Sequence, residues 1–472
     1  MRLIYLFPMR VASSSWCLGL AIAFVSSTTG CDSSDDGGGG EGGGVSNANV
    51  SFHEHVEPLI QRSCLSCHMP GLIGGFSLEK YDEAKPLAGL IAKKTAAREM
   101  PPFLAQDTDE CQVARPFVDD LRLSDDEIAM LQAWADNGAP EGDPAKAPPP
   151  YEAKLPGLAN AELELEAEEP GLVDGTSDVF ECVVYDPALT ETRFIDGIHI
   201  LAGNPQIAHH ALIFRSSRQD AVELAGGGTR FPCFGNPPGE LMHAWAPGGL
   251  PLELPDTVGM ELGADDVIIV QMHYHPTGVA AEDSSTIQLR FTDEAPLYAY
   301  QVALIGNSSS ASDGLLPGDG DSGLPEFRIP ANAVGHVEEM VQPVDPSVVP
   351  ISIPILLVAT HMHYVGVDMR FWIERPSPDG SEPADECLLH TPKWDFNWQR
   401  GYMYDTPISE LPYASPGDTL HMRCVYDNRL ENPFVQEALD DLGMSAPQDV
   451  RLGETTLDEM CLVAVGILVP NF

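Results

Sequence analysis

Apolar residues follow a helical period in the first folded part of the chain, which begins near Ser51. Four of them share one helix face: Phe52, Val56, Leu59 and Ile60. A spacing of three and four residues stacks side chains along one side of a helix. This segment is therefore predicted to be an amphipathic helix.

A later helix has clearer boundaries. Ser124 followed by Glu127 forms a capping box, in which each side chain bonds the backbone N–H of the other residue. The apolar residues after it recur at helical spacing: Ile128, Leu131 and Trp134. Gly138 supplies a helix stop, and the Pro- and Ala-rich stretch 140–150 is typical of a linker.

The hydrophobic pattern changes after the linker. Short apolar or alternating runs, separated by Gly, Pro, Asp and Asn, occupy residues 207–214, 267–274, 287–291, 353–358 and 369–373. Such runs predict antiparallel strands packed as β-sandwiches. The polar loop 307–325 marks either the boundary between two sandwiches or a surface excursion, and we place the boundary slightly before it.

These patterns together predict a multidomain chain, with a small all-α domain followed by two antiparallel, jelly-roll-like β-sandwiches. The length of 472 residues suits three globular units. The expected order is a signal segment, a flexible Gly-rich tether, the helical domain, a linker and the two sandwiches. Their expected ranges are 1–30, 31–50, 51–142, 143–160, 161–300 and 301–472.

The N-terminal end has the features of an export signal. Arg2 and Arg10 precede an apolar run at 16–25 that is too short to span a bilayer, and small residues lead to Cys31. This end resembles a bacterial lipoprotein signal, in which the cysteine is lipidated, although Thr28 stands where such signals usually have Leu. Plain secretion is the alternative. We expect an exported protein, periplasmic or at the cell surface.

The charge balance excludes several classes of partner. The chain has 71 acidic and 25 basic residues, a net charge of −46, and no basic cluster. Nucleic acid and anionic membrane surfaces are poor partners for such a protein. Membrane association is therefore expected only through a lipid anchor at Cys31.

Cys64, Cys67 and His68 form a CxxCH motif. In this motif two thiols form thioethers to haem vinyl groups while the histidine reaches the iron. The pentapeptide alone also fits a redox pair or a zinc site, but export and the helical run before it favour one covalently attached haem c. Ten cysteines in an exported chain also predict disulfides, and six remain after the signal, the lipidation site and this motif are set aside.

An electron carrier needs a second axial haem ligand. Met100, in a Met-Pro-Pro segment, is the best candidate, because a thioether ligand raises the haem potential. Met69 is too close to His68 to reach the opposite haem face, and Met130 lies on an apolar helix face. With these features and the Trp-containing final helix, residues 51–142 resemble small single-haem class I-like cytochrome c domains.

Three histidine pairs lie in or beside predicted strands: His209 with His210, His273 with His275, and His361 with His363. The i, i+2 spacing of the last two pairs points both side chains to one face of a strand. The adjacent first pair requires a bulge or a strand end for joint coordination. A single histidine is more often a packed or surface residue, but three pairs in one exported chain indicate metal binding.

The identity of the metal depends on the softness of its ligands. Imidazole suits copper and zinc, whereas a thioether ligand favours Cu(I), but spacing alone does not select one of the 15 methionines. Residues 175–470 resemble the ascorbate-dependent type II copper monooxygenases, a family that includes peptidylglycine α-hydroxylating monooxygenase and dopamine β-hydroxylase. Four ordered blocks carry the resemblance: His209-His210, the Gln-x-His-Tyr strand 271–274, the His-x-His 361–363 and the Glu-Met-Cys segment 459–461.

The resemblance implies two copper ions on separate sandwiches facing a solvent-filled cleft. One set of ligands, for the copper that stores and passes an electron, is His209, His210 and His273, with Gln271 supporting the site. The other set, for the copper that binds O₂ and substrate, is His361, His363 and Met460. His275 is then a neighbour of the first site and not a ligand.

The resemblance also implies two disulfides and limits the substrate. It pairs Cys182 with Cys233 and Cys424 with Cys461, and it leaves Cys111 and Cys387 unassigned. The positions that bind a peptide substrate in the peptide enzyme are Ala359, Leu462 and Ala464 here, which argues against a C-terminal glycine peptide. Three nearby aromatic residues either line an apolar pocket or belong to a sandwich core: Trp394, Phe396 and Trp398.

The leading hypothesis is an exported copper-dependent monooxygenase that hydroxylates a C–H bond of a small organic substrate with O₂. Hydroxylation consumes two external electrons, so the fused haem c is expected to supply them after reduction by an external donor. The alternative is a non-catalytic periplasmic electron-transfer or copper-binding protein. In a third interpretation, the haem docks to a respiratory partner while another reductant feeds the copper.

Overall fold

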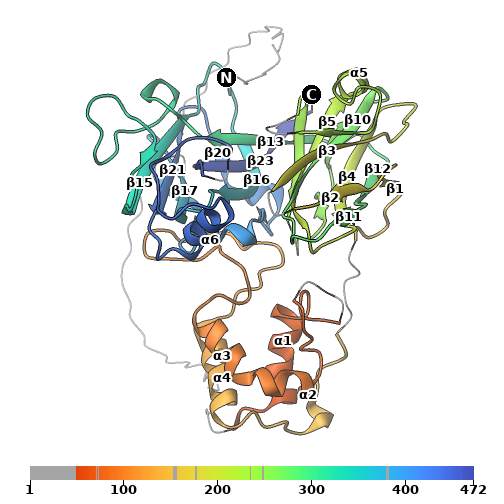
Figure 1. Ribbon diagram of the computed structural model, residues 1–472. Helices are drawn as coiled ribbons and strands as arrows, with labels where there is room; N and C mark the ends of the chain where they lie inside the picture. The colour runs from red at the N-terminus through yellow and green to blue at the C-terminus, as the bar shows by residue number, and fades with distance from the viewer. Residues whose placement is uncertain are drawn as a thin grey trace, which may run out of the picture.

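A computed structural model describes residues 49–471, apart from short stretches at 71, 73, 152–156, 176–177, 234, 236, 247–248, 379–381 and 456. The expected signal segment, its lipidation site Cys31 and nearly all of the tether lie outside the described residues. Strands dominate the fold, and the helices are few and short. Figure 1 shows a group of helices set apart from two groups of strands. None of the described helices is long and apolar enough to cross a membrane.

The first helices close around an apolar core of their own. They are η2 (Phe52–Val56), α1 (Glu57–Ser63), α2 (Tyr81–Ala84), η3 (Lys85–Leu87), α3 (Ala88–Ala96) and α4 (Asp125–Asp136), with a short turn η4 (Pro144–Lys146) after them. The apolar face predicted for residues 52–60 is buried in this core. The capping box of Ser124 and Glu127 begins α4, and Gly138 follows its end with a φ of +79°.

One stretch of the expected helical domain packs elsewhere. Phe103 and Phe117 are buried in the large apolar core of the strands and not in the core of the helices. The backbone N–H groups of Leu104 and Ala105 donate to the Tyr402 hydroxyl at 3.1 and 3.2 Å. Residues 103–118 therefore bind the helical unit to the β part, because their aromatic side chains find a larger apolar core there.

Ten strands form one large sheet in the order β1-β12-β4-β9-β13-β23-β16-β19, with β8 beside β4 and β20 beside β16. Their bounds are β1 (Leu163–Glu166), β4 (Arg193–Leu201), β8 (Leu252–Glu253), β9 (Val258–Leu262), β12 (Thr286–Thr292), β13 (Tyr298–Gly306), β16 (Ile353–His361), β19 (Tyr402–Met403), β20 (Tyr413–Ala414) and β23 (Leu462–Pro470). All neighbours are antiparallel except β9 and β13, which run parallel over two residue pairs.

A five-stranded sheet packs against the first half of the large sheet, in the order β6-β3-β10-β5-β7. Its strands are β3 (Val179–Tyr185), β5 (Ala208–Ser217), β6 (Arg230–Pro232), β7 (Glu240–Trp245) and β10 (Asp266–Tyr274), and α5 (Arg218–Leu224) follows β5. A small ribbon of β2 (Gly171–Val173) and β11 (Ala281–Asp283) lies beside them. The apolar runs predicted at 207–214, 267–274 and 287–291 are strands of this sandwich.

A four-stranded sheet packs against the second half, in the order β15-β21-β17-β18. Its strands are β15 (Val334–Pro343), β17 (Gly366–Glu374), β18 (Asp385–Thr391) and β21 (Thr419–Asp427). The remaining elements are β14 (Arg328–Ile329), β22 (Val450–Arg451), α6 (Pro433–Asp441) and the turns η5 (Ala311–Asp313), η6 (Phe396–Trp398) and η7 (Ile408–Glu410). The fold is thus of the β-sandwich type, with two sandwiches that share one sheet.

The expected boundary at residue 300 falls inside β13, where the shared sheet passes from one sandwich to the other. The polar loop after β13 is a surface excursion that returns along β15. Leu316 N–H donates to Glu339 O, and Val341 N–H donates to Gly314 O, each at 2.9 Å. The two sandwiches therefore meet within β13, before the polar loop. Because β13 belongs to the shared sheet, a continuous strand connects them there.

Three disulfides join described cysteines: Cys111–Cys387, Cys182–Cys233 and Cys424–Cys461. The prediction of disulfides is confirmed, and the last two pairs are those that the resemblance implies. The first pair joins the two cysteines left unassigned by the sequence. It ties residues 103–118 to β18 across 276 positions of chain.

Candidate metal centres

The first histidine group forms where β5 begins and β10 ends. His210 pairs with His273 across these strands, but the next pair is Ala208 with Tyr274, so His209 is an extra residue in a β-bulge. A bulge turns the side chain of the extra residue away from its regular direction. The two adjacent histidines therefore lie on the same side of the sheet, as binding of one metal ion by both of them requires.

The ring nitrogens of this group converge. Nδ1 of His210 lies 3.1 Å from Nδ1 of His209 and 3.3 Å from Nδ1 of His273. One ligand atom from each ring lies within 4.8 Å of the others. Among the described residues, these three histidines are the one group of at least three His, Cys, Asp or Glu side chains close enough to hold a metal ion. Three converging nitrogen donors fit a copper or zinc ion.

Asp178 supports this group from just before β3. Its Oδ2 atom lies 3.2 Å from Nε2 of His273, and its Oδ1 atom lies 2.9 Å from Nδ1 of His275. Although burial opposes ionisation, the contacts with both histidines hold the pKa of the Asp178 carboxyl below its usual range. A carboxylate behind the far nitrogen of His273 orients the ring so that Nδ1 faces the other two imidazoles.

The protonation state of the group suits metal binding. Burial lowers the pKa of His209 to about 4, and burial followed by the neighbouring histidines lowers the pKa of His210. Both rings are therefore neutral near pH 7, and a neutral imidazole has the lone pair that a metal needs.

The hydrogen bonds of the Gln271 side chain to described residues do not include one to a histidine. Its amide nitrogen donates to the carbonyl oxygens of Cys233 and Gly235 at 3.3 and 2.6 Å. Gln271 thus holds the chain that follows the Cys182–Cys233 disulfide, beside His273 on the same strand. His275 contacts Asp178 and is not one of the three converging rings.

The second histidine group begins at the end of β16. Thr360 and Met362 are buried inward, whereas His361 and His363 alternate with them and project to the opposite face. Nδ1 of His361 donates to Gln399 Oε1 at 2.7 Å, and Nδ1 of His363 donates to the Asp458 carbonyl at 2.9 Å. With Nδ1 protonated, each ring keeps its Nε2 lone pair for a metal.

Burial also keeps these two rings neutral. It lowers the pKa of His361 to about 3 and lowers that of His363 as well. The ring centroids lie 5.2 Å apart with nearly perpendicular planes.

Met460 is connected to the second group through the backbone. His361 at the end of β16 pairs with Leu462 at the start of β23, and Met460 lies two residues before Leu462. Glu459 fixes this arrangement, because its Oε2 atom accepts from the N–H groups of both His363 and Met460. Two imidazoles and one thioether are a donor set that fits copper better than zinc.

Glu459 is fully buried, and its other oxygen accepts from the N–H groups of Val365 and Gly366 at 3.2 and 3.1 Å. Burial raises the pKa of this carboxyl to about 8, against the opposing effect of the four backbone donors. The Glu459 side chain therefore fixes the backbone of the second group through these four hydrogen bonds.

The two groups face each other across one aromatic ring. Phe396 stacks on His209 at a centroid distance of 5.1 Å, and it lies 6.4 Å from His363. Its exposed fraction is 7%, so one buried ring lies between an imidazole of each group. The solvent-filled cleft that the resemblance implies stays a prediction. Trp394 belongs to the large apolar core of the strands and Trp398 packs against it, so the sandwich-core alternative holds for these two residues.

The CxxCH residues lie at the end of α1. Cys67 and His68 N–H both donate to the Cys64 carbonyl, at 3.1 and 2.9 Å, in a tight turn. Both thiols are free, although the other described cysteines form disulfides. Burial raises the pKa of Cys64 to about 12 and raises that of Cys67.

His68 is oriented for an axial role. Its Nδ1 lies 3.3 Å from the Phe76 carbonyl, which leaves Nε2 for a metal. A Cβ on Gly74 would come within 2.4 Å of His68 Nδ1, so only glycine allows the chain to pass this close to the ring. Two free thiols beside a held imidazole fit the attachment of haem c.

Met100 lies in the loop after α3. It lines a small cavity together with Arg98, Phe103 and Leu123. Met69 and Met130 instead pack against the core of the helices. The assignment of Met100 as the second axial ligand stays a prediction.

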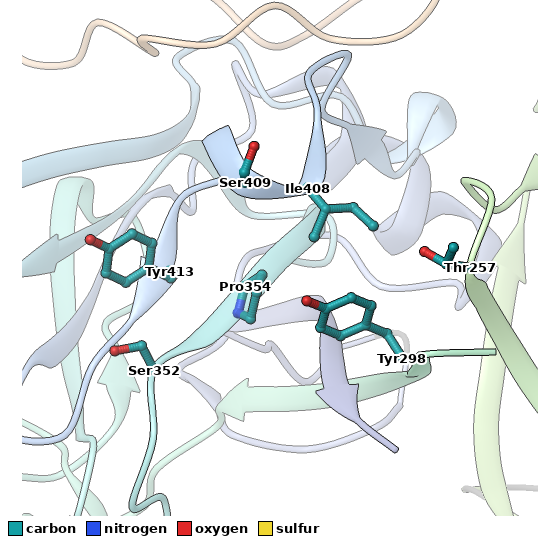
Figure 2. A pocket seen from close by; sticks show the side chains of 7 residues that line it. All are labelled: Thr257, Tyr298, Ser352, Pro354, Ile408, Ser409 and Tyr413. Atoms are coloured by element: carbon teal, nitrogen blue, oxygen red, sulfur yellow. The ribbon is translucent and has the colours of Figure 1, made fainter. Parts of the chain in front are cut away.

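An open cavity of about 640 Å³ lies between the sandwiches, and none of the candidate metal ligands lines it. Figure 2 shows its lining, which includes Thr257 from the first sandwich and Pro354, Ile408 and Tyr413 from the second. Pro354 and His361 are at opposite ends of β16, about 23 Å apart for an extended strand. This cavity is therefore not the candidate catalytic site.

Two residues of the site were not identified from the sequence: Asp178 and Gln399. Asp178 is one of 71 acidic residues and has no motif around it. Gln399 follows the aromatic run at 394–398, which was the only local signal for this segment. Their roles depend on strands that are distant in sequence.

No protein-family model matches this sequence, and no curated protein matches it either. Similar solved structures include the N-terminal CBM22-1-CBM22-2 tandem domain of Paenibacillus barcinonensis Xyn10C, with a TM-score of 0.14 and 11% identity, covering 63% of this chain and 80% of that one. They also include the VP2 subviral particle of infectious bursal disease virus, with a TM-score of 0.17 and 10% identity, covering 68% and 84%. Likeness at this level carries no argument about function.

Proposed function

We propose that this chain is an exported copper monooxygenase that hydroxylates a C–H bond of a small organic substrate with O₂, using electrons delivered through a fused cytochrome c domain. The observation that carries the proposal is the pair of dissimilar donor sets on facing sandwiches. One set is three converging imidazoles, and the other is His361 and His363, with the backbone of Met460 tied to that of His363 by Glu459.

Two dissimilar sites favour an enzyme over a copper carrier. A carrier needs a single type of site, whereas O₂ chemistry with external electrons gains from one site that handles electrons and another that handles O₂ and substrate. Bound copper would supply one-electron redox chemistry and the oxidant that removes hydrogen from a C–H bond.

Neighbouring groups fix the orientation of the ligand rings at both sites. Asp178 holds His273, and Gln399 and the Asp458 carbonyl hold His361 and His363, so each ring presents a fixed nitrogen. Phe396, which is buried, lies beside both His209 and His363.

The reaction balances with two electrons and two protons from outside the substrate. One oxygen atom of O₂ enters the C–H bond as a hydroxyl group, and the other leaves as water. The helical unit, which we propose to be a class I-like cytochrome c domain, is the source of these electrons. Cys64, Cys67 and His68 would hold its haem, with Met100 on the opposite face.

The experiment that tests this function supplies ¹⁸O₂ to copper-loaded holoprotein whose haem is kept reduced by a one-electron donor. A panel of aromatic and aliphatic amines, alcohols and hydrocarbons is screened by mass spectrometry. The expected result is a product about 18 mass units heavier than its parent, because one ¹⁸O atom is inserted into a C–H bond, with matching haem oxidation.

The Met460→Ile variant is the control, because it keeps the volume of the side chain and removes the thioether. It is expected to bind copper at the first site and to lose product formation. If the haem of the wild-type protein is oxidised when copper is bound, but no tested compound takes up ¹⁸O, the chain is a non-catalytic electron-transfer protein.

A further inference from the structure

The short segment between β18 and β19 that carries Phe396 is tied to the second histidine group at both of its ends. At its start, Trp394 Nε1 donates to the His363 carbonyl oxygen at 3.3 Å. At its end, Gln399 Oε1 accepts from His361 Nδ1 at 2.7 Å, and Gln399 Nε2 donates to the Phe396 carbonyl oxygen at 3.0 Å. The backbone at Phe396 is therefore held in place relative to both imidazoles of the second group.

The Phe396 side chain stacks on one ring from each sandwich. Its centroid lies 4.3 Å from that of Tyr364, with planes 29° apart, and 5.1 Å from that of His209, with planes 21° apart. Tyr364 directly follows the second histidine group along the chain, whereas His209 belongs to the first group. Rings at such separations attract each other beyond the burial of their surface. Phe396 therefore connects the second sandwich to a candidate ligand of the first site.

The same ring also lies beside the second group itself. The centroid of Phe396 is 6.4 Å from that of His363, and the two planes are 84° apart. The centroids of His209 and His363 are therefore no farther apart than the sum of their distances to Phe396. Because Phe396 is buried, its close-packed neighbours hold the ring in one position. One packed side chain thus spans an imidazole of each group.

We propose that Phe396 is a positioning residue, whose ring fixes the separation of the two proposed copper sites. This inference rests on the function proposed above. In that function, each hydroxylation requires the electron stored at the first site to reach the second site. One electron leaves the first site, which is oxidised from the cuprous to the cupric form, and the second site is reduced by that electron. No bond forms or breaks in the transfer itself.

A fixed separation favours this transfer, because a small misplacement of reacting groups slows a reaction strongly. The ring of Phe396 lies against His209 and beside His363, so the two sites keep their spacing without a movement of the sandwiches. A leucine at position 396 would keep an apolar side chain there and lose the ring that stacks on His209. A tyrosine would keep the ring.

Pulsed dipolar electron paramagnetic resonance tests the inference on the full-length holoprotein loaded with cupric ions. With both microwave frequencies set within the copper spectrum, the method measures the distance between the two ions. A single narrow distribution of distances is expected for the wild type. Phe396→Leu is expected to shift and broaden this distribution while the copper content stays at that of the wild type, and Phe396→Tyr is expected to restore it.

Phe371→Leu is the matched control. Phe371 is a fully buried phenylalanine on β17, in the large apolar core of the strands. The wild-type distribution is expected in this variant. Broadening in Phe371→Leu equal to that in Phe396→Leu would show a general loosening of the core and would refute a specific role for Phe396.

The inference is also overturned if Phe396→Leu keeps the wild-type distribution with both coppers bound. Loss of the first copper from that variant would overturn it as well, because the ring would then support metal binding and not spacing. Intact ¹⁸O incorporation in either case would leave the proposed function standing without this role. If the distances change as expected while no compound takes up ¹⁸O, the spacing role stands and the proposed hydroxylation fails. A single copper per wild-type chain would refute both.

Discussion

The imidazoles of the two histidine groups are held by different neighbours, and this decides which nitrogen each ring offers. In the first group, Asp178 lies behind Nε2 of His273, so Nδ1 faces inward. In the second group, Gln399 and a backbone carbonyl occupy Nδ1 of His361 and His363, so Nε2 is free. The same residue type thus builds two distinct sites through its outer contacts.

Asp178→Asn is expected to weaken copper binding at the first site by about 10- to 100-fold, because the ring of His273 loses its charged support. Isothermal titration with copper measures the affinity of each site. Asp174→Asn is the control, since the Asp174 side chain is exposed and accepts from the neighbouring Gly175 N–H. Equal affinities in the two variants would show that Asp178 does not orient the ligand.

His199 on β4 gives a pH dependence outside the metal groups. It is 5% exposed, and burial lowers its pKa to about 4. Between pH 6.5 and 4 the unfolded chain takes up a proton at this position and the folded chain does not, so stability falls as the pH falls. The loss from this single group amounts to about 3 kcal/mol.

His199→Gln is therefore expected to reduce the difference in stability between pH 7 and pH 4.5. Guanidinium unfolding of the wild type and the variant at both pH values measures it. Identical differences in the two proteins would mean that His199 is protonated in the folded state.

A bulge and a strand end create the sites at the scale of elements. The bulge at His209 puts two adjacent histidines on one side of β5, and β16 ends at His361, which pairs with the first residue of β23. A shift of either register by one residue would send the ligands to the opposite face.

The turn after α1 depends on a close approach of backbone to a side chain. Gly74→Ala is expected to reduce covalent haem content, because the added methyl group would lie 2.4 Å from His68 Nδ1. The absorbance of the alkaline pyridine haemochrome per chain measures this content. Gly89→Ala in α3 is the control, since it meets nothing within 4 Å and should raise stability by about 0.5 to 1 kcal/mol. Full haem content in Gly74→Ala would contradict the turn geometry.

The shared sheet and the Cys111–Cys387 disulfide determine how the whole molecule holds its three units together. Replacing both cysteines by serine is expected to destabilise the attachment of residues 103–118 by about 3 to 5 kcal/mol, because the closed loop is long. Limited proteolysis should then cut between residues 101 and 121. The same replacement at Cys182 and Cys233 should leave that stretch protected, and cleavage there in both variants would contradict the assignment.

The sequence predicted features that depend on neighbours along the chain. The strand positions, the α4 capping box and the need for a bulge at His209 follow from local spacing and were found. Asp178, the burial of Phe103 in the β core and the place of Phe396 between the groups were not predicted. Each depends on contacts between segments distant in sequence, which hydrophobic periodicity does not encode.

The central claim is that the chain holds two different copper ions, one of them with a thioether ligand. X-ray absorption at the copper edge, on reduced protein loaded to saturation, tests it most directly. The account predicts two coppers per chain and a sulfur neighbour that disappears in Met460→Ile while one nitrogen-bound copper remains. A single copper per chain, or a sulfur signal unchanged in Met460→Ile, would contradict it.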